Sequence, residues 1–248
     1  MLHYIQALSE EIFTSIRETK VMAKQELYER SPIRSFDKIT DGGLKAGELG
    51  LVTAKKGLGK TSVLVQFGID QLLAGNQLVH VSFDQHSSNV ISWYDDIYTE
   101  IAKKRTVTNA EDTKEQLDKC RTILNFNQDT FSLEKVVNTL NALKAGGFNI
   151  AGVVIDGVDF AKATEEDIQA VASYAKATNA RVWISSTVED DTLKGQAPKQ
   201  LLDYFTAVVH LSASSSVTKV NVLKMGDRTD ISSDLKLDPK TLLITQIQ

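Results

Sequence analysis

Between residues 49 and 61 the chain reads LGLVTAKKGLGKT. The first five of these residues form a short apolar run, which predicts a buried strand. Two glycines and three lysines follow, and helix-like periodicity then runs over residues 61–73. A strand, a glycine-rich turn and a helix in this order fit the phosphate-binding P-loop pattern, with Ala54 at the first position, where glycine is usual.

Each part of this segment has a chemical role in holding a phosphate. The glycines let successive backbone N–H groups point at phosphate oxygens, and the following helix presents the positive end of its dipole. Lys60 would bridge the β- and γ-phosphates, and the Thr61 hydroxyl would bind Mg²⁺. A chance match is the alternative, but the flanking strand and helix argue against it. We therefore expect ATP to contact Ala54, Lys55, Lys56, Gly57, Leu58, Gly59, Lys60, Thr61 and Ser62.

A magnesium ion on a nucleotide also needs a carboxylate at the end of a nearby strand. The most apolar strand of the chain, residues 150–155, is followed directly by Asp156. We predict that Asp156 and Thr61 hold the metal, and that Asp159, three residues further on, is a weaker alternative. The competing interpretation is an ordinary aspartate that ends a strand.

Hydrolysis requires a group that orients or deprotonates the attacking water. The strand predicted over residues 78–83 is followed by Asp84, a candidate base, and Gln85, a candidate water-orienting residue. Either could equally be a solvated loop residue, and we interpret His86 as a surface histidine. Thr187, which follows a strand over residues 181–185, is a candidate sensor of the γ-phosphate.

Apolar runs alternate with helix-like segments along most of the chain. Strands are predicted at 49–53, 78–83, 122–125, 150–155 and 181–185, and helices at 61–73, 89–105, 110–121, 132–145 and 165–177. Unbroken apolar strands that alternate with helices indicate an α/β fold, in which a mainly parallel twisted sheet carries helices on both faces. Segments 207–211 and 218–223, and then 235–237 and 242–244, predict two antiparallel hairpins at the C-terminal end.

Residues 2 to about 28 have the pattern of an amphipathic helix, and Ser31-Pro32 would end any helix there. One interpretation is a helix packed on its own core; the other is an arm that docks on a neighbouring subunit. We therefore divide the chain into an N-terminal helical arm, residues 1–30, and an ATPase domain, residues 31–248.

Composition limits the class of protein. The 248 residues carry 28 Lys+Arg and 32 Asp+Glu, a net charge of −4, which does not favour a nucleic-acid partner. The single cysteine, Cys120, suits a reducing compartment. No apolar run approaches the roughly 20 residues that span a bilayer. We expect a soluble, cytoplasmic protein without a membrane partner.

Several of these segments together resemble the RecA superfamily of P-loop ATPases, most closely its KaiC, RadA and DnaB branches. The resemblance begins with the FDKITDGGLKAGEL run at residues 36–49 and continues through the P-loop, the SFDQ run at 82–85 and the VVID run at 153–156. It ends with VNVLKMGDR at 220–228, which is similar to the late KaiC-type "VLKMRG" strand. It thus covers roughly residues 33–246.

The resemblance implies a RecA-like P-loop core that assembles into a ring or filament of identical subunits, with ATP between them and a hexamer as one candidate. In such families a lysine and an arginine of the late strand reach the γ-phosphate of the neighbouring subunit. Lys224 matches the lysine, whereas the arginine position holds Gly226 and Arg228 lies two residues further on. The usual catalytic glutamate is replaced by Asp84, which is one methylene shorter.

Three functions fit these features. The favoured one is a KaiC-like oligomeric switch that hydrolyses ATP slowly and acts through a protein partner. The second is a DNA-stimulated recombinase- or helicase-like ATPase, against which the acidic residues at 189–191 argue. The third is a nucleotide-binding protein without hydrolysis.

Overall fold

The computed structural model describes residues 21–103, 110–214 and 217–247. Its centre is a ten-stranded sheet whose order is β10-β9-β7-β6-β1-β5-β4-β2-β3, with β8 paired to β7. Six neighbouring strands of this sheet are parallel. They are β1 (Leu49–Ala54), β2 (Gln77–Ser82), β3 (Arg121–Asn125), β4 (Ile150–Asp156), β5 (Arg181–Thr187) and β6 (Ala207–Ser214).

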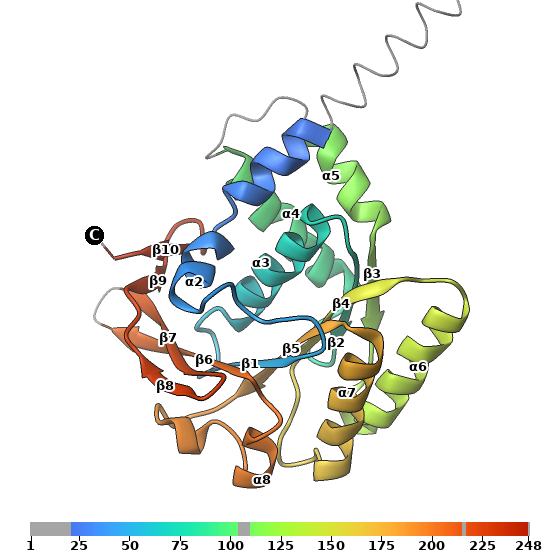
Figure 1. Cartoon of the computed structure of the whole chain (residues 1–248), viewed down its shortest axis with the longest axis vertical. Helices are drawn as coiled ribbons and strands as arrows, with labels where there is room; N and C mark the ends of the chain where they lie inside the picture. The colour runs from blue at the N-terminus through green and yellow to red at the C-terminus, as the bar shows by residue number, and fades with distance from the viewer. Residues whose placement is uncertain (1–20, 104–109, 215–216, 248) are drawn as a thin grey trace, which may run out of the picture.

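Helices cover both faces of these strands, which confirms the predicted α/β fold (Figure 1). One face packs against α3 (Lys60–Leu73), α4 (Ser87–Lys103) and α5 (Ala110–Lys119), and the other against α6 (Leu133–Ala145), α7 (Glu165–Thr178) and α8 (Lys199–Leu202). Side chains of β1 alternate between the two apolar cores: Val52 and Ala54 lie in the α3 core, and Leu49 and Leu51 in the α7 core.

The sequence sets the ends of several helices through local hydrogen bonds. Ser132 caps α6, since its hydroxyl accepts from the Lys135 N–H at 3.2 Å. Thr164 and Asp167 form a capping box at the start of α7. Gly75, with a φ of +91°, follows the end of α3 and returns the chain to the sheet.

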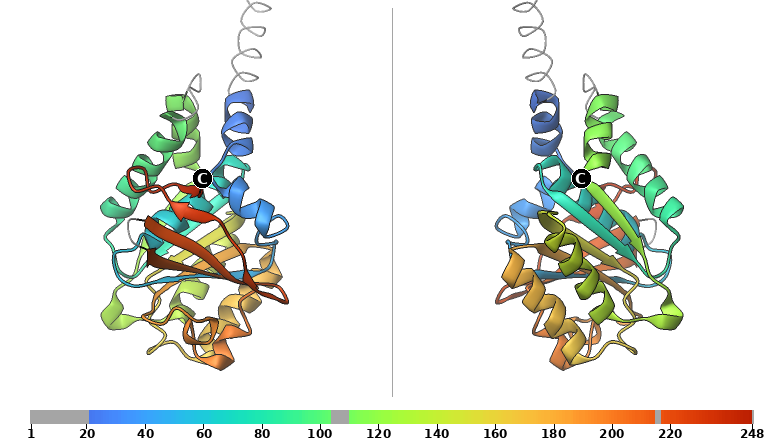
Figure 2. Two further views of the ribbon diagram at one scale, coloured as in Figure 1. Left: turned by 90° about the vertical axis from the view of Figure 1, so that its left-hand side faces the viewer. Right: turned by 90° about the vertical axis from the view of Figure 1, so that its right-hand side faces the viewer.

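The remaining strands are antiparallel: β7 (Val217–Met225), β8 (Arg228–Ile231), β9 (Leu235–Leu237) and β10 (Ile244–Gln246). Both predicted hairpins are present, as β6–β7 and β9–β10. The last strand begins at Ile244 and not at Leu242, because Leu242 takes a φ of +56° in the connecting turn. β8 was not predicted. β9 and β10 form one edge of the sheet and pack in the same apolar core as α2 and α3 (Figure 2).

A buried amide joins the β9–β10 hairpin to the helix that follows the P-loop. Gln66 of α3 donates to the Leu242 carbonyl at 3.0 Å and accepts from the Ile244 N–H at 2.8 Å. Its side chain is 1% exposed. The C-terminal strands are therefore bound to α3 by polar as well as apolar contacts.

Residues 21–29 are helical, the chain breaks at residues 30–32, and α2 (Ile33–Ile39) begins after Pro32. The break was predicted from Ser31-Pro32, but α2 was not. Most of the predicted N-terminal arm, residues 1–20, lies outside the described residues, so the division into residues 1–30 and 31–248 stays a prediction.

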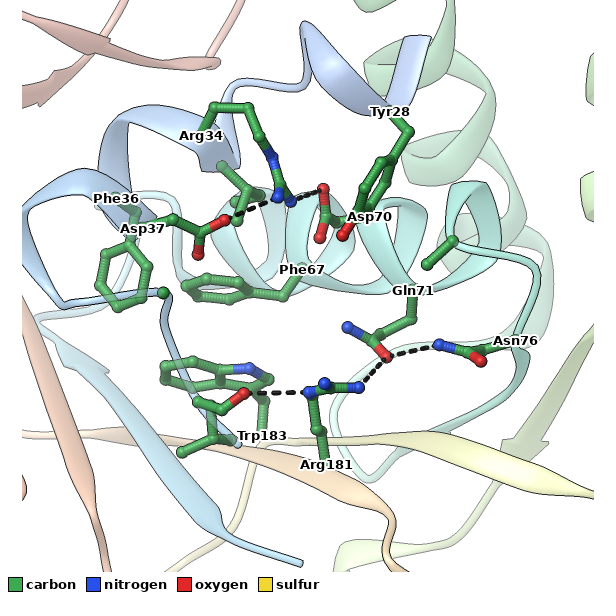
Figure 3. A pocket seen from close by; sticks show the side chains of 14 residues that line it. Tyr28, Arg34, Phe36, Asp37, Phe67, Asp70, Gln71, Asn76, Arg181 and Trp183 are labelled. Carbon is green, nitrogen blue, oxygen red and sulfur yellow. Dashed lines mark hydrogen bonds and ion pairs between the residues drawn. The ribbon is translucent and has the colours of Figure 1, made fainter. Parts of the chain in front are cut away.

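A cavity of about 230 Å³ lies between α2, α3 and β5 (Figure 3). Its polar side chains bind one another: Arg34 pairs with Asp70 at 2.5 Å and Asp37 at 2.8 Å, and Arg181 donates to the Gln71 side-chain Oε1 at 3.3 Å. Burial raises the pKa of Asp70 and of Asp37, although Arg34 opposes both shifts. The Arg34–Asp70 pair joins α2 to α3, and none of the P-loop residues lines this cavity.

Within the described residues, no helix is both long enough and apolar enough to cross a membrane.

Candidate nucleotide-binding site

The parallel strands bring the predicted site residues to one edge of the sheet. Ala54 at the end of β1 lies beside Thr187 of β5, and Asp156 at the end of β4 lies beside Ser82 of β2. The loops that follow β1, β2, β4 and β5 therefore meet there, as ligand-binding loops do in open α/β sheets.

The P-loop lies between β1 and α3. Gly57 and Gly59 have φ values of +85° and +97°, a backbone conformation that favours glycine. A side chain at Gly59 would also place its Cβ 2.8 Å from the Leu237 side chain. The Ser62 side chain is buried and donates to the Gly59 carbonyl at 2.8 Å, so it stabilises the loop from inside and does not line the cleft.

Lys60 is the half-buried cation of the site. Its ammonium donates to the Ala54 carbonyl at 3.3 Å. Burial lowers the pKa of Lys60, and the carboxylates of Asp156 and Asp84 oppose that shift. A phosphate anion at this point would favour the charged ammonium in the same direction as the two carboxylates do.

The Thr61 hydroxyl joins the P-loop to the last residue of β4 and to a residue that follows β2. It donates to the Asp156 Oδ2 at 2.8 Å and accepts from the Gln85 Nε2 at 3.0 Å. Ser185 of β5 donates to the other carboxylate oxygen of Asp156 and accepts from the Gly157 N–H at 3.0 Å. Asp156 is 2% exposed, so its orientation is set by buried partners.

Asp84 is exposed and lies at the border of two clefts. The P-loop cleft, of about 650 Å³, is within the size range of small-molecule sites. An adjoining cleft of about 310 Å³ shares Asp84 and Thr187 with it and also contains Asp159. The P-loop cleft is lined by Lys56, Gly57, Leu58, Gly59, Lys60, Thr61, Asp84, Gln85, Trp93, Asp156, Thr187, Thr218 and Leu242.

Four of these observations were not predicted from the sequence. Trp93 falls within the helix predicted over residues 89–105, and Thr218 and Leu242 fall within predicted hairpin strands, yet all three line the P-loop cleft. Gln128, in the 3₁₀ turn η1 (Gln128–Thr130), donates to the Asp84 Oδ1 at 2.9 Å. The only sign in the sequence that Gln128 could belong to the site is that it is a polar residue shortly after the strand predicted at 122–125.

Lys224 and Arg228 lie away from the cleft of their own chain. Lys224 is level with Val208 on β6, and its ammonium donates to the Leu202 carbonyl at 3.3 Å. Arg228 pairs with Asp41 at 2.5 Å, and both side chains are exposed. His86 is exposed, as predicted, and its ring contacts Ser88. Ala54 and Lys55 adjoin the P-loop cleft without lining it.

The chain matches the model of a known protein family. The family model described as "ATPase: KaiC" matches residues 30–178. This range includes α2, the P-loop, Asp84, Gln85 and Asp156, and it ends before Thr187, Lys224 and Arg228. A search of curated proteins found no match.

Proposed function

Because the chain belongs to the KaiC family of ATPases, we propose that it is a slow, magnesium-dependent ATPase that acts as an oligomeric nucleotide switch. Family membership supports ATP binding by a RecA-like core. The proposal adds a metal, hydrolysis at a low rate and assembly with other copies of the chain. It also adds a protein, in place of DNA, as the partner that the switch acts on.

One observation carries the magnesium part of the proposal: the Thr61 hydroxyl lies 2.8 Å from the Asp156 carboxylate, directly at the P-loop. Hydroxyl and carboxylate oxygens are ligands that Mg²⁺ prefers, and phosphate oxygens and waters complete its octahedron. The donor set therefore fits a metal that arrives with a nucleotide. When bound, Mg²⁺ would neutralise charge on the β- and γ-phosphates.

Slow turnover is inferred from the residue that would activate water. Asp84 occupies the position where similar families carry glutamate, and its shorter side chain reaches less far into the cleft. Gln85, which contacts the Thr61 hydroxyl, is the candidate that orients water. Assembly with other copies of the chain is inferred from the exposure of two side chains at the cleft. Asp84 and Thr187 border the cleft on its open side, where a neighbouring subunit could supply a cation.

The proposal is tested by phosphate release from Mg-ATP with the purified protein. We expect turnover that requires Mg²⁺, is lost in Lys60→Ala and is unchanged in Lys144→Ala, an exposed lysine at the end of α6. Loss of the ammonium removes a charge-assisted contact to phosphate, so turnover should fall at least 100-fold. Wild-type turnover in Lys60→Ala would exclude the P-loop as the site.

The same assay separates a protein switch from a DNA-stimulated enzyme. Single-stranded DNA is added at low salt, where phosphate contacts are strongest. We expect no stimulation, because Glu189 and Asp191 border the loop after β5; Glu189 pairs with Lys55 at 3.8 Å and Asp191 with His210 at 3.0 Å. Stimulation that declines as salt rises would contradict the switch and favour a recombinase- or helicase-like function.

A further inference from the structure

We propose that Gln128 is a positioning residue for ATP hydrolysis and acts by holding the Asp84 carboxylate at the P-loop cleft. The proposal rests on the proposed ATPase function and adds a residue that no part of the sequence pattern assigns. Gln128 lies 44 residues after Asp84, in the turn that follows β3.

The Gln128 amide uses its nitrogen for two bonds. It donates to the Asp84 Oδ1 at 2.9 Å and to the Gly157 carbonyl at 2.6 Å. A primary amide has two N–H groups, so these bonds use both of them. The Gln128 backbone carbonyl accepts from the Lys162 ammonium at 3.1 Å. The donor that faces Asp84 is thus fixed in orientation by contacts on either side.

Asp84 rests against the backbone of Gly157. A Cβ added to Gly157 would lie 2.4 Å from the Asp84 Cγ, so the carboxylate occupies space that a larger residue would fill. Gly157 has a φ of +84° and follows Asp156 directly. The Asp84 carboxylate therefore packs against the residue that directly follows Asp156, the predicted metal ligand.

The turn that holds Asp84 is itself bonded to the end of β2. The Phe126 N–H donates to the Ser82 carbonyl at 2.9 Å, and the Asn125 side chain donates to the Gln85 carbonyl. Asn127 caps η1 by accepting from the Asp129 N–H at 2.8 Å. The segment 125–128 thus binds both Asp84 and Gln85, the two residues proposed to act on water.

Holding the Asp84 side chain in one rotamer affects turnover, because Asp84 is exposed. A short carboxylate free to change rotamer would spend part of its time turned from the cleft, and a displacement of about 1 Å can reduce a rate about 100-fold. In the observed conformation Asp84 lines the P-loop cleft, and it is close enough to Lys60 for its charge to raise the pKa of that ammonium. Gln128 makes no contact with the P-loop among the described residues, so nucleotide affinity should not depend on it.

The test compares Gln128→Met, which keeps the side-chain length and removes the amide, with Thr130→Val in the same turn. Among the residues that the structure describes, the Thr130 hydroxyl bonds to the Asn127 carbonyl alone. We expect Gln128→Met to lower kcat about 10- to 100-fold while the ATP dissociation constant changes less than about twofold. Thr130→Val should retain wild-type kcat. An unchanged kcat in Gln128→Met, or an equal loss in both variants, would overturn the proposal.

A double-mutant cycle with Asp84→Asn identifies the route of the effect. If Gln128 acts through Asp84, adding Gln128→Met to Asp84→Asn should lower kcat no further, whereas independent effects would multiply. Multiplied effects would overturn the positioning role. The wild type, the two single variants and the double variant are also unfolded in urea without ATP. If Gln128 and Asp84 are in contact, the changes that the two substitutions cause in the free energy of unfolding are not additive. A wild type that binds ATP but does not hydrolyse it would overturn the proposed function, so the two failures are distinguishable.

Discussion

At the scale of single residues, His80 is a buried imidazole in the middle of β2. Its Nδ1 lies 3.0 Å from the Tyr94 hydroxyl, and its Nε2 has no partner among the described residues. Burial lowers the pKa of His80 to about 3, and the nearby Arg121 charge acts in the same direction. The folded protein therefore keeps this ring neutral at pH values where an unfolded chain would protonate it.

Because His80 stays neutral in the folded protein, we expect the protein to lose stability in mild acid. Below about pH 6.5 the unfolded chain binds a proton that the folded chain does not, so the free energy of unfolding falls as pH decreases toward 3. Between pH 7 and pH 5 the loss amounts to about 2 kcal/mol from this group. We expect His80→Gln, which cannot titrate, to remove that part of the pH dependence in urea unfolding.

The matched control is His86→Gln, because His86 is exposed. It should leave the pH dependence close to that of the wild type. A wild type with the same unfolding free energy at pH 5 and pH 7, or an equal effect of both substitutions, would contradict the assignment of the pH dependence to His80.

Single residues also show where sequence interpretation ends. The P-loop, Asp156, Asp84 and Gln85 follow apolar strands, and this local signal was sufficient to predict that they meet. Gln128 carries no such signal, because its contact exists only once β3 pairs with β2 and sets Asn125 beside Ser82. Periodicity predicts that strands exist, but it does not say which strands are neighbours.

At the scale of secondary-structure elements, the C-terminal hairpin depends on α3. Gln66 bonds to Leu242 and Ile244 from a buried position, so a substitution leaves the Leu242 carbonyl and the buried Ile244 N–H without this partner. We expect Gln66→Leu to lower the free energy of unfolding by about 1–3 kcal/mol. The backbone amides of residues 235–247 should exchange with solvent faster than in the wild type.

Hydrogen exchange followed by mass spectrometry measures both the size and the place of this effect. The control is Gln25→Leu, since the exposed Gln25 side chain bonds, within the described part of the chain, to Glu29 alone, at 2.8 Å. If Gln66→Leu accelerated exchange evenly over the molecule, the hairpin would not be a unit held by this amide.

Elements differ in how well the sequence predicted them. The buried strands and the longer helices were predicted within one to three residues, because a continuous apolar run or a helical stripe marks each. β8, with the sequence RTDI, has no such pattern and is a strand because β7 offers it backbone partners. α2 follows Pro32 and includes residues 36–39, the start of the run that resembles the RecA superfamily. Both depend on tertiary context, which overrides weak local preference.

At the scale of the whole molecule, Lys224 does not reach its own P-loop cleft. It donates to Leu202 of α8, outside the cleft lining. The resemblance that implies a role for Lys224 places its contact on a neighbouring subunit. The resemblance thus implies that each active site is formed by two chains.

A mixing experiment tests the shared site. Lys60→Ala and Lys224→Ala should each have low activity alone, the first from a defective cleft and the second from a missing cation. In a mixed oligomer, the intact Lys224 of one chain meets the intact cleft of the other, so ATP turnover should recover to about a quarter of the wild-type rate or less. Mixtures with no activity above the two separate variants would contradict a contribution in trans.

The place of β1 in the sheet has a consequence for how the protein is made. β1 pairs with residues 181–187 and 207–214, both more than a hundred residues later in the chain. At about 5–20 residues per second, a ribosome needs several seconds or more to supply these partners. Throughout that interval the strand before the P-loop has no neighbour in its sheet. The residues that hold the nucleotide are translated early, but the site they form is completed only near the end of synthesis.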